Sequence, residues 1–372
     1  MPFDVRDFPG APPGERAASS RNRRLVASWL FAICGMILVM VVLGGVTRLT
    51  GSGLSIMEWA PLSGILPPLN HADWEKLFAL YKQIPQYRLE HPGFGLSGFQ
   101  QIFWLEWLHR FWGRLIGIAF FIPLVWFWAA GRIERRLRPR LVVIFLLGGA
   151  QGAVGWFMVE SGFFPDSISV SPYRLAVHLA LALVLYAALL WTALGLVQPN
   201  RQPVAAGAPL RVLLLLCCVL VALTIVAGSF VAGTHAGFEY NSFPLMEGRL
   251  VPADYARLAP FLRNLTQNPA AVQFDHRLLA TLTALITALA AIFAAVTRVP
   301  PTARAATAAL GGLVGLQYSL GIATLLLVVP VPIAAAHQAC AVLVLTASLV
   351  ALHAMRPMPA RRKSRVRPAL AE

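Results

Sequence analysis

The chain has 372 residues, of which 58% are hydrophobic and only 13% are charged. Soluble domains carry about 25% charged residues, so the composition excludes a soluble enzyme, a secreted disulfide scaffold or a disordered tail as a description of the whole chain. The net charge is +15, and in a chain this apolar the excess of Lys and Arg reflects membrane orientation rather than a nucleic-acid surface. We therefore expect a polytopic membrane protein that binds no nucleic acid.

Uncharged runs place the membrane-spanning helices along the chain. A helix rises 1.5 Å per residue, so about 20 residues cross a hydrocarbon layer roughly 30 Å thick. One run, residues 305–355, is long enough for two helices, and Pro330 and Pro332 are expected to divide it near its middle. The runs that suffice for one helix each are 25–47, 141–159, 175–200, 212–233 and 278–297.

The second span in the chain differs from the others because it must contain charged residues. Its uncharged part, residues 115–131, is too short to cross the bilayer comfortably, so we expect the helix to begin near Phe99. Charged residues inside a membrane-spanning helix are costly and are more often functional than incidental. Those that this helix must include are Glu106, His109, Arg110 and Arg114.

The basic residues predict the orientation of the eight spans. An even number of spans puts both termini on one side, and Lys and Arg favour the cytoplasmic side. Arginines crowd the N-terminal arm, the loop 132–140 and the C-terminal tail, whereas the segment from Arg48 to Phe99 has as many acidic as basic residues. We expect cytoplasmic termini, a long external loop and, because the N-terminal arm contains acidic residues and no cleavable signal peptide, a bacterial inner membrane.

An internal repeat divides the chain into two halves. EWLHR around His109 recurs as QFDHR around His276, LGGAQGAVG recurs as LVGLQYSLG, and His178 corresponds to His337, in the same order and at nearly constant offset. Such a duplication predicts an all-α integral membrane fold of two pseudo-symmetric four-helix bundles related by an axis along the membrane normal. The predicted domains are an N-terminal arm (1–24), a first bundle (25–200), a second bundle (201–356) and a basic cytoplasmic tail (357–372).

The four repeated histidines suggest haem ligation. Each lies near the outer start of an even-numbered span, so two histidines in each half share one depth and can face each other across a bundle, as in bis-imidazole ligation. A single intramembrane histidine is more often a hydrogen-bonded packing residue, but four at symmetric positions favour ligation, and zinc would need more protein ligands. The remaining histidines, which we expect not to be ligands, are His71, His91, His235 and His353.

Charged residues beside the histidines leave two questions open. Arg110 and Arg277 either pair with haem propionates or extend toward the polar surface. Glu106 lies three residues before His109, whereas the corresponding position in the second half is Gln273. One alternative is that Glu106 only neutralises Arg110. Arg277 is retained without an acid, however, so we favour a role for Glu106 in proton handling or substrate positioning. The first half is then expected to perform chemistry and the second to hold a redox haem.

Long motifs of the chain resemble those of the haem A synthase family, which makes haem A from haem O. The resemblance extends from about Leu25 to Met355 and includes the final HQ. The longer motifs are GGVTRLTGSGLSIMEWAPLSGILPP, EWLHRFWGRLIG, NSFPLMEGRLVP, VQFDHR and LGIATLL. All four cysteines fall in predicted spans, so the chain resembles the branch that lacks cysteine pairs in its outer loops, and no thiol-dependent step is carried over.

The resemblance implies a reaction and a role for each histidine pair. The reaction is oxidation of the C8 methyl group of haem O to a formyl group by successive hydroxylations, which supplies haem A for cytochrome c oxidase assembly. The resemblance also implies that His276 and His337 ligate the iron of a haem b cofactor, that His109 and His178 receive the iron of haem O, and that Glu106 is the acid of the EWxHR motif. A membrane electron donor is required. Contacts with a haem O synthase and homo-oligomerisation remain open.

Two other functions use the same sequence features. A di-haem b-type cytochrome for quinol-linked electron transfer needs the same histidines, but it tends to place its haems at different depths to carry electrons across the membrane. A transporter built from parallel repeats is a second alternative. It has no need of four symmetric histidines, so the depth and number of the histidines favour the synthase.

Overall fold

A computed structural model describes residues 13–60, 63–165, 167–198 and 208–356. Within these residues eight helices are long and apolar enough to cross a membrane, and no strand is formed. The predicted tail and the first half of the predicted N-terminal arm lie outside the described residues. The eight long helices are α1 (Pro13–Leu49), α4 (Leu96–Ala129), α5 (Arg138–Glu160), α6 (Pro172–Val197), α7 (Ala208–Gly233), α9 (Pro269–Val296), α10 (Pro301–Leu326) and α11 (Val331–Ala354).

The long helices begin and end where the local sequence requires it. Prolines occupy the first turn of α5, α6, α9, α10 and α11, where a missing N–H costs nothing. The predicted break in the last uncharged run is confirmed, because the chain turns between α10 and α11 through Val328 and Val329, which have φ values of 59° and 58°. The charged second span is also confirmed, since α4 begins at Leu96 and contains Glu106.

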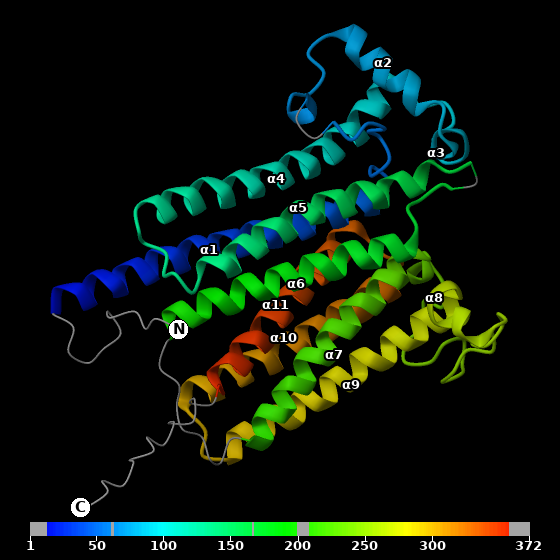
Figure 1. The fold of residues 1–372 in the computed structure, drawn as a ribbon. Helices are drawn as coiled ribbons and strands as arrows, with labels where there is room; N and C mark the ends of the chain where they lie inside the picture. The colour runs from blue at the N-terminus through cyan, green and yellow to red at the C-terminus, as the bar shows by residue number, and fades with distance from the viewer. Residues whose placement is uncertain (1–12, 61–62, 166, 199–207, 357–372) are drawn as a thin grey trace, which may run out of the picture.

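Contacts between the long helices group them into two rings of four. In the first ring α1, α4, α5 and α6 each contact two neighbours, and in the second ring α7, α9, α10 and α11 do the same. As a result α4 lies across the ring from α6, and α9 lies across from α11. The rings meet where α1 and α6 pack against α7 and α11, so the four helices at this interface belong to both halves of the chain (Figure 1).

Short helices cover one end of the long ones. On the first ring, α2 (His71–Tyr81) and α3 (Pro85–Leu89) pack on the projecting start of α4, around a small buried cluster that includes Phe78, Tyr81 and Phe99. The second ring has the shorter α8 (Asn264–Gln267) at the same end (Figure 1). The remaining short elements are 3-10 turns at Ser63–Ile65, Ser161–Phe163, Ala236–Phe238 and Phe261–Arg263.

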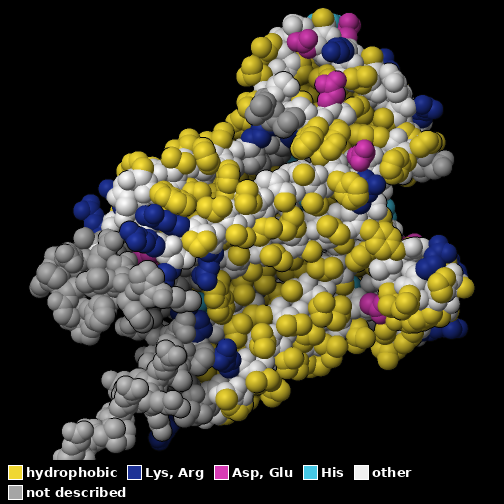
Figure 2. All heavy atoms as spheres, viewed as in Figure 1, with side chains coloured by type: hydrophobic (Ala, Val, Ile, Leu, Met, Phe, Trp, Pro, Cys, Tyr) yellow, Lys and Arg dark blue, Asp and Glu magenta, His cyan; other side chains and the backbone are white. Residues whose placement is uncertain are grey.

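The surface agrees with a multi-pass membrane protein. Figure 2 shows hydrophobic side chains over the middle of the long helices, a cluster of Lys and Arg at the end where α4 meets α5, and acidic side chains mainly at the opposite end. Large apolar side chains that a soluble protein would bury, such as Ile122, Leu146 and Ile292, are exposed by 60–64%. Their exposure is expected of helices whose outer faces contact lipid.

Candidate functional site

The structure brings together the histidine pairs that the repeat predicts. His109 on α4 and His178 on α6 belong to the first ring, and His276 on α9 and His337 on α11 belong to the second. Each pair therefore joins two helices that lie across a ring from each other. No group of three or more His, Cys, Asp or Glu residues in the described part of the chain is arranged for a metal ion, whereas two imidazoles per ring suit an iron whose other four ligands come from a macrocycle.

A glycine on the neighbouring helix makes room for each of the four imidazole rings. In three of the contacts a methyl group in place of the glycine would lie 2.9–3.1 Å from Cε1 of the histidine, and in the fourth it would lie 3.0 Å from Nε2 of His109. Real Cβ atoms are rarely this close to another atom, so a side chain at any of these positions would displace the ring. The pairs are Gly44 with His109, Gly155 with His178, Gly228 with His276 and Gly321 with His337.

The histidines are also oriented by polar neighbours. Nδ1 of His276 donates to the backbone oxygen of Thr224 at 3.1 Å, which leaves the lone pair on Nε2 for a metal. Nε2 of Gln151 lies 3.2 Å from Nδ1 of His178, and Nε2 of Gln317 lies 3.4 Å from Nε2 of His337. These glutamines are the central residues of the repeated LGGAQGAVG and LVGLQYSLG motifs.

The glycine contacts predict a test of the second ring. Gly321→Ala is expected to push the His337 ring and to lower the amount of haem that copurifies with the protein at least twofold, measured from the reduced pyridine haemochrome. Gly315→Ala is the matched control, because it lies on the same helix and a methyl group there meets nothing within 4 Å. Equal haem content in the two variants would contradict a close fit between Gly321 and His337.

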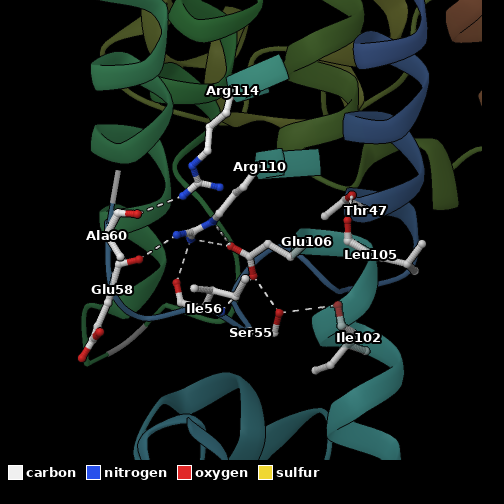
Figure 3. Close-up of polar contacts among 10 residues, drawn as sticks. All are labelled: Thr47, Ser55, Ile56, Glu58, Ala60, Ile102, Leu105, Glu106, Arg110 and Arg114. Atoms are coloured by element: carbon white, nitrogen blue, oxygen red, sulfur yellow. Dashed lines mark hydrogen bonds and ion pairs between the residues drawn. The ribbon is translucent and has the colours of Figure 1, made fainter. Parts of the chain in front are cut away.

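Glu106 and Arg110 on α4 hold the segment that follows α1 (Figure 3). One carboxylate oxygen of Glu106 accepts from Ser55 Oγ at 2.7 Å and from the Ile56 backbone N–H at 2.9 Å. The other oxygen accepts from Nη2 and Nε of Arg110 at 2.6 and 3.0 Å. Arg110 in turn donates to the backbone oxygens of Ile56 and Glu58, both at 2.7 Å. The buried carboxylate is thereby fully paired, which a charge at this depth requires.

The second half holds its external segment with a neutral side chain in place of the acid. Nε2 of Gln273 donates to the backbone oxygens of Ala236 and Glu239 at 2.7 and 2.6 Å, and its Oε1 accepts from Arg277 at 2.8 Å. Arg277 also donates to the backbone oxygens of Tyr240 and Ser242, at 2.7 and 2.9 Å. The two halves therefore use the same design, but only the first places a carboxylate in it.

These contacts add a function for the arginines that the sequence did not reveal. Arg110 and Arg277 donate to loop carbonyls, so they anchor the external segments rather than simply extending to the surface. Their contact with propionates stays a prediction. The signal that might have indicated the anchoring is the spacing of four residues between Glu106 and Arg110 and between Gln273 and Arg277, which puts both members of each pair on one helix face.

The other four histidines lie apart from the pairs. Nδ1 of His91 is 2.6 Å from the hydroxyl of Tyr81 in the outer cluster, and burial lowers the pKa of His91 and raises that of Tyr81. His235 has a left-handed backbone with φ of 57° after the end of α7, and its pKa is lowered by burial and then by the charge of Arg48. His71 pairs with an acid, and His353 packs on an aromatic ring; their partners are Glu75 and Trp191.

Comparison with known proteins identifies the family. The COX15-CtaA family, described as cytochrome oxidase assembly protein, matches residues 27–349. The chain is 59% identical over 336 residues to a protein of Granulibacter bethesdensis named "Heme A synthase", with 90% of this chain and 88% of that protein covered. It is 49% identical to "Heme A synthase 2" of Acidiphilium cryptum, covering 93% and 95% of the two chains, and 49% identical to "Heme A synthase" of Rhodospirillum centenum, covering 94% and 92%. The match covers most of both bundles, and the chain therefore belongs to the COX15-CtaA family of cytochrome oxidase assembly proteins.

Proposed function

We propose that this protein is a haem A synthase of the bacterial inner membrane, which oxidises the C8 methyl group of haem O to a formyl group for cytochrome oxidase assembly. The observation that carries the proposal is the pair of opposed histidines inside each ring, each seated on a glycine of the neighbouring helix. The names of the relatives support the reaction. The apolar faces of eight long helices support the location, since haem O carries a hydrophobic tail suited to a lipid-facing enzyme.

The two histidine pairs take different haems in this proposal. His276 and His337 ligate the iron of a resident haem b, and His109 and His178 receive the iron of haem O. The residues present fit two haems. A glycine gives each imidazole space, and the hydrogen bond from Nδ1 of His276 to the backbone oxygen of Thr224 leaves Nε2 of His276 for a metal. A resident haem supplies single electrons to the reaction when it is bound.

In this proposal the polypeptide positions the substrate and covers the first ring. The external segment 55–60 is tied to α4 on both sides of His109. Glu106 holds it one turn before His109, and Arg110 and Arg114 hold it after, the latter by a bond to the backbone oxygen of Ala60 at 2.9 Å. In the proposed mechanism this segment closes the outer mouth of the first ring and limits the access of water to the bound substrate. Glu106, the acid at this position, positions the segment and handles protons released during oxidation.

Haem analysis in a defined host tests the reaction. The protein is expressed together with a haem O synthase in bacteria that lack their own haem A pathway, and the extracted haems are separated by chromatography. We expect haem A to appear, and we expect none from cells that express the haem O synthase alone. If only haems B and O are found while the purified protein carries b-type haem, the electron-transfer cytochrome becomes the better description.

A further inference from the structure

A glutamine next to one histidine ligand connects the two rings. Gln338 follows His337 on α11, and its Nε2 donates to the backbone oxygen of Val41 on α1 at 3.1 Å. The amide oxygen of the same side chain lies directly against Gly45, so that any side chain at position 45 would collide with it. The end of Gln338 therefore packs against α1, which belongs to the first ring.

The contact continues from Gly45 to the first histidine pair. Gly44, the preceding residue of α1, is the glycine that seats His109. His109 is also the one paired histidine that turns Nε2 toward its glycine, whereas the other three present Cε1. A small displacement of α1 at Gly44 therefore acts on the imidazole ring of His109. The path runs from His337 through Gln338, Gly45 and Gly44 to His109.

The repeat shows that this contact is an addition to the common design. Gly228 on α7 seats His276 as Gly44 on α1 seats His109, so Gly45 corresponds to Ser229. The residue that follows His178, and thus corresponds to Gln338, is Leu179. Both residues of the contact differ from their counterparts in the other half. On α11 the counterpart of Gln338 is Leu179, and on α1 the counterpart of Gly45 is Ser229. A polar side chain within a membrane-spanning helix is costly unless it gains a partner.

We propose that Gln338 is a positioning residue of the reaction, which fixes α1 against α11 and thereby sets the place of His109 from the helix that carries His337. The inference rests on the proposed function, because it assigns the two ends of the path to the substrate and cofactor pairs. A substitution of Gln338, in the second half, is then expected to change the position of His109 in the first half. If the change is specific to Gln338, it shows that the two histidine pairs are connected through this residue. If other contacts between the rings have the same effect, it reflects general packing.

Mutually compensating variants test the connection. Purified wild-type protein and variants are loaded with haem O and studied by absorption and electron paramagnetic resonance spectroscopy, with conversion to haem A measured separately. Gly45→Ala is expected to change the low-spin signal of the haem at His109 and His178 and to lower conversion at least tenfold. Gln338→Ala is expected to change the same signal by a smaller amount. The Gly45→Ala/Gln338→Ala double variant is expected to recover from the Gly45→Ala level to that of Gln338→Ala, because the shortened side chain leaves room for the methyl group.

Two control variants separate this effect from general packing. Gly35→Ala lies on the same helix α1, where a methyl group meets nothing within 4 Å. Thr346→Val removes another contact between the rings, the 2.7 Å hydrogen bond between Tyr186 and Thr346 on α6 and α11. We expect both controls to keep the wild-type signal of the substrate haem.

The outcomes distinguish the inference from the function on which it rests. If Gln338→Ala leaves the substrate-haem signal and conversion at wild-type values, Gln338 is not a positioning residue, even where Gly45→Ala fails to accumulate in the membrane. If Thr346→Val changes the signal as much as Gln338→Ala, the effect is general packing and the inference is wrong. A wild-type protein that binds no haem at either pair overturns the proposed function itself.

Discussion

Replacing either His276 or His337 with alanine is expected to abolish the six-coordinate b-type haem spectrum of the purified protein. Each imidazole supplies one axial ligand, so its loss leaves at most a five-coordinate, high-spin iron. Haem b is also held less tightly, and we expect its stoichiometry to fall at least fivefold. Absorption spectra of the reduced protein and the pyridine haemochrome measure both quantities.

The first histidine pair and an outer histidine provide the comparisons. His109→Ala and His178→Ala are expected to retain the resident b-type spectrum but to lose haem O binding and conversion. His71→Ala is a neutral control, since its side chain is 74% exposed and pairs only with Glu75 in the external region. Full six-coordinate spectra in both His276→Ala and His337→Ala would refute the assignment of haem b to this pair.

The sequence predicted the helices and the histidine pairs because both follow regular rules. Long uncharged runs must span the bilayer as helices, and α4 begins only three residues before the expected Phe99. His109 and His178 share a ring because both lie in the first half, and the duplication predicts the same arrangement for His276 and His337 in the second half. The orientation of the termini and the symmetry of the halves stay predictions.

Other features of the site depend on packing that sequence spacing does not determine. Gly155 and Gly321 end the repeated motifs, but nothing in those motifs indicates that each glycine faces an imidazole of the next helix. Arg110 and Arg277 donate to backbone oxygens in loops. Loops have no regular sequence pattern, so these contacts could not be predicted from the sequence. Gln338 stood out only as part of a family motif, since its partner, Gly45, lies almost three hundred residues away.

Glu106→Gln is expected to stop the conversion of haem O while leaving the haem b of the second ring in place. The glutamine that serves the second half directs its amide N–H groups at two carbonyl oxygens. At position 106 the neighbours are instead donors, namely the N–H of Ile56, the hydroxyl of Ser55 and the guanidinium of Arg110. A glutamine at position 106 places its amide N–H group next to one of these donors. It also removes the negative charge that pairs with Arg110. A charged hydrogen bond of this kind contributes about 1.5–3 kcal/mol, which is roughly a 10- to 150-fold change. The loss of the acid adds to this effect, and we expect conversion to fall at least a hundredfold.

A second variant separates the two roles proposed for Glu106. Ser55→Ala removes one bond to the carboxylate but keeps the acid and its pairing with Arg110. If Glu106 acts mainly by holding the segment 55–60, Ser55→Ala should lower conversion several-fold, whereas a pure proton-handling role predicts nearly wild-type conversion. Haem O conversion is measured beside haem b content and thermal stability, so that misfolding is recognised. Unchanged conversion in Glu106→Gln would exclude the proton-handling role, because the amide exchanges no proton with substrate. The amide oxygen can still accept from Ser55 and Ile56, which donate to one oxygen of Glu106, so Ser55→Ala is the test of the holding role.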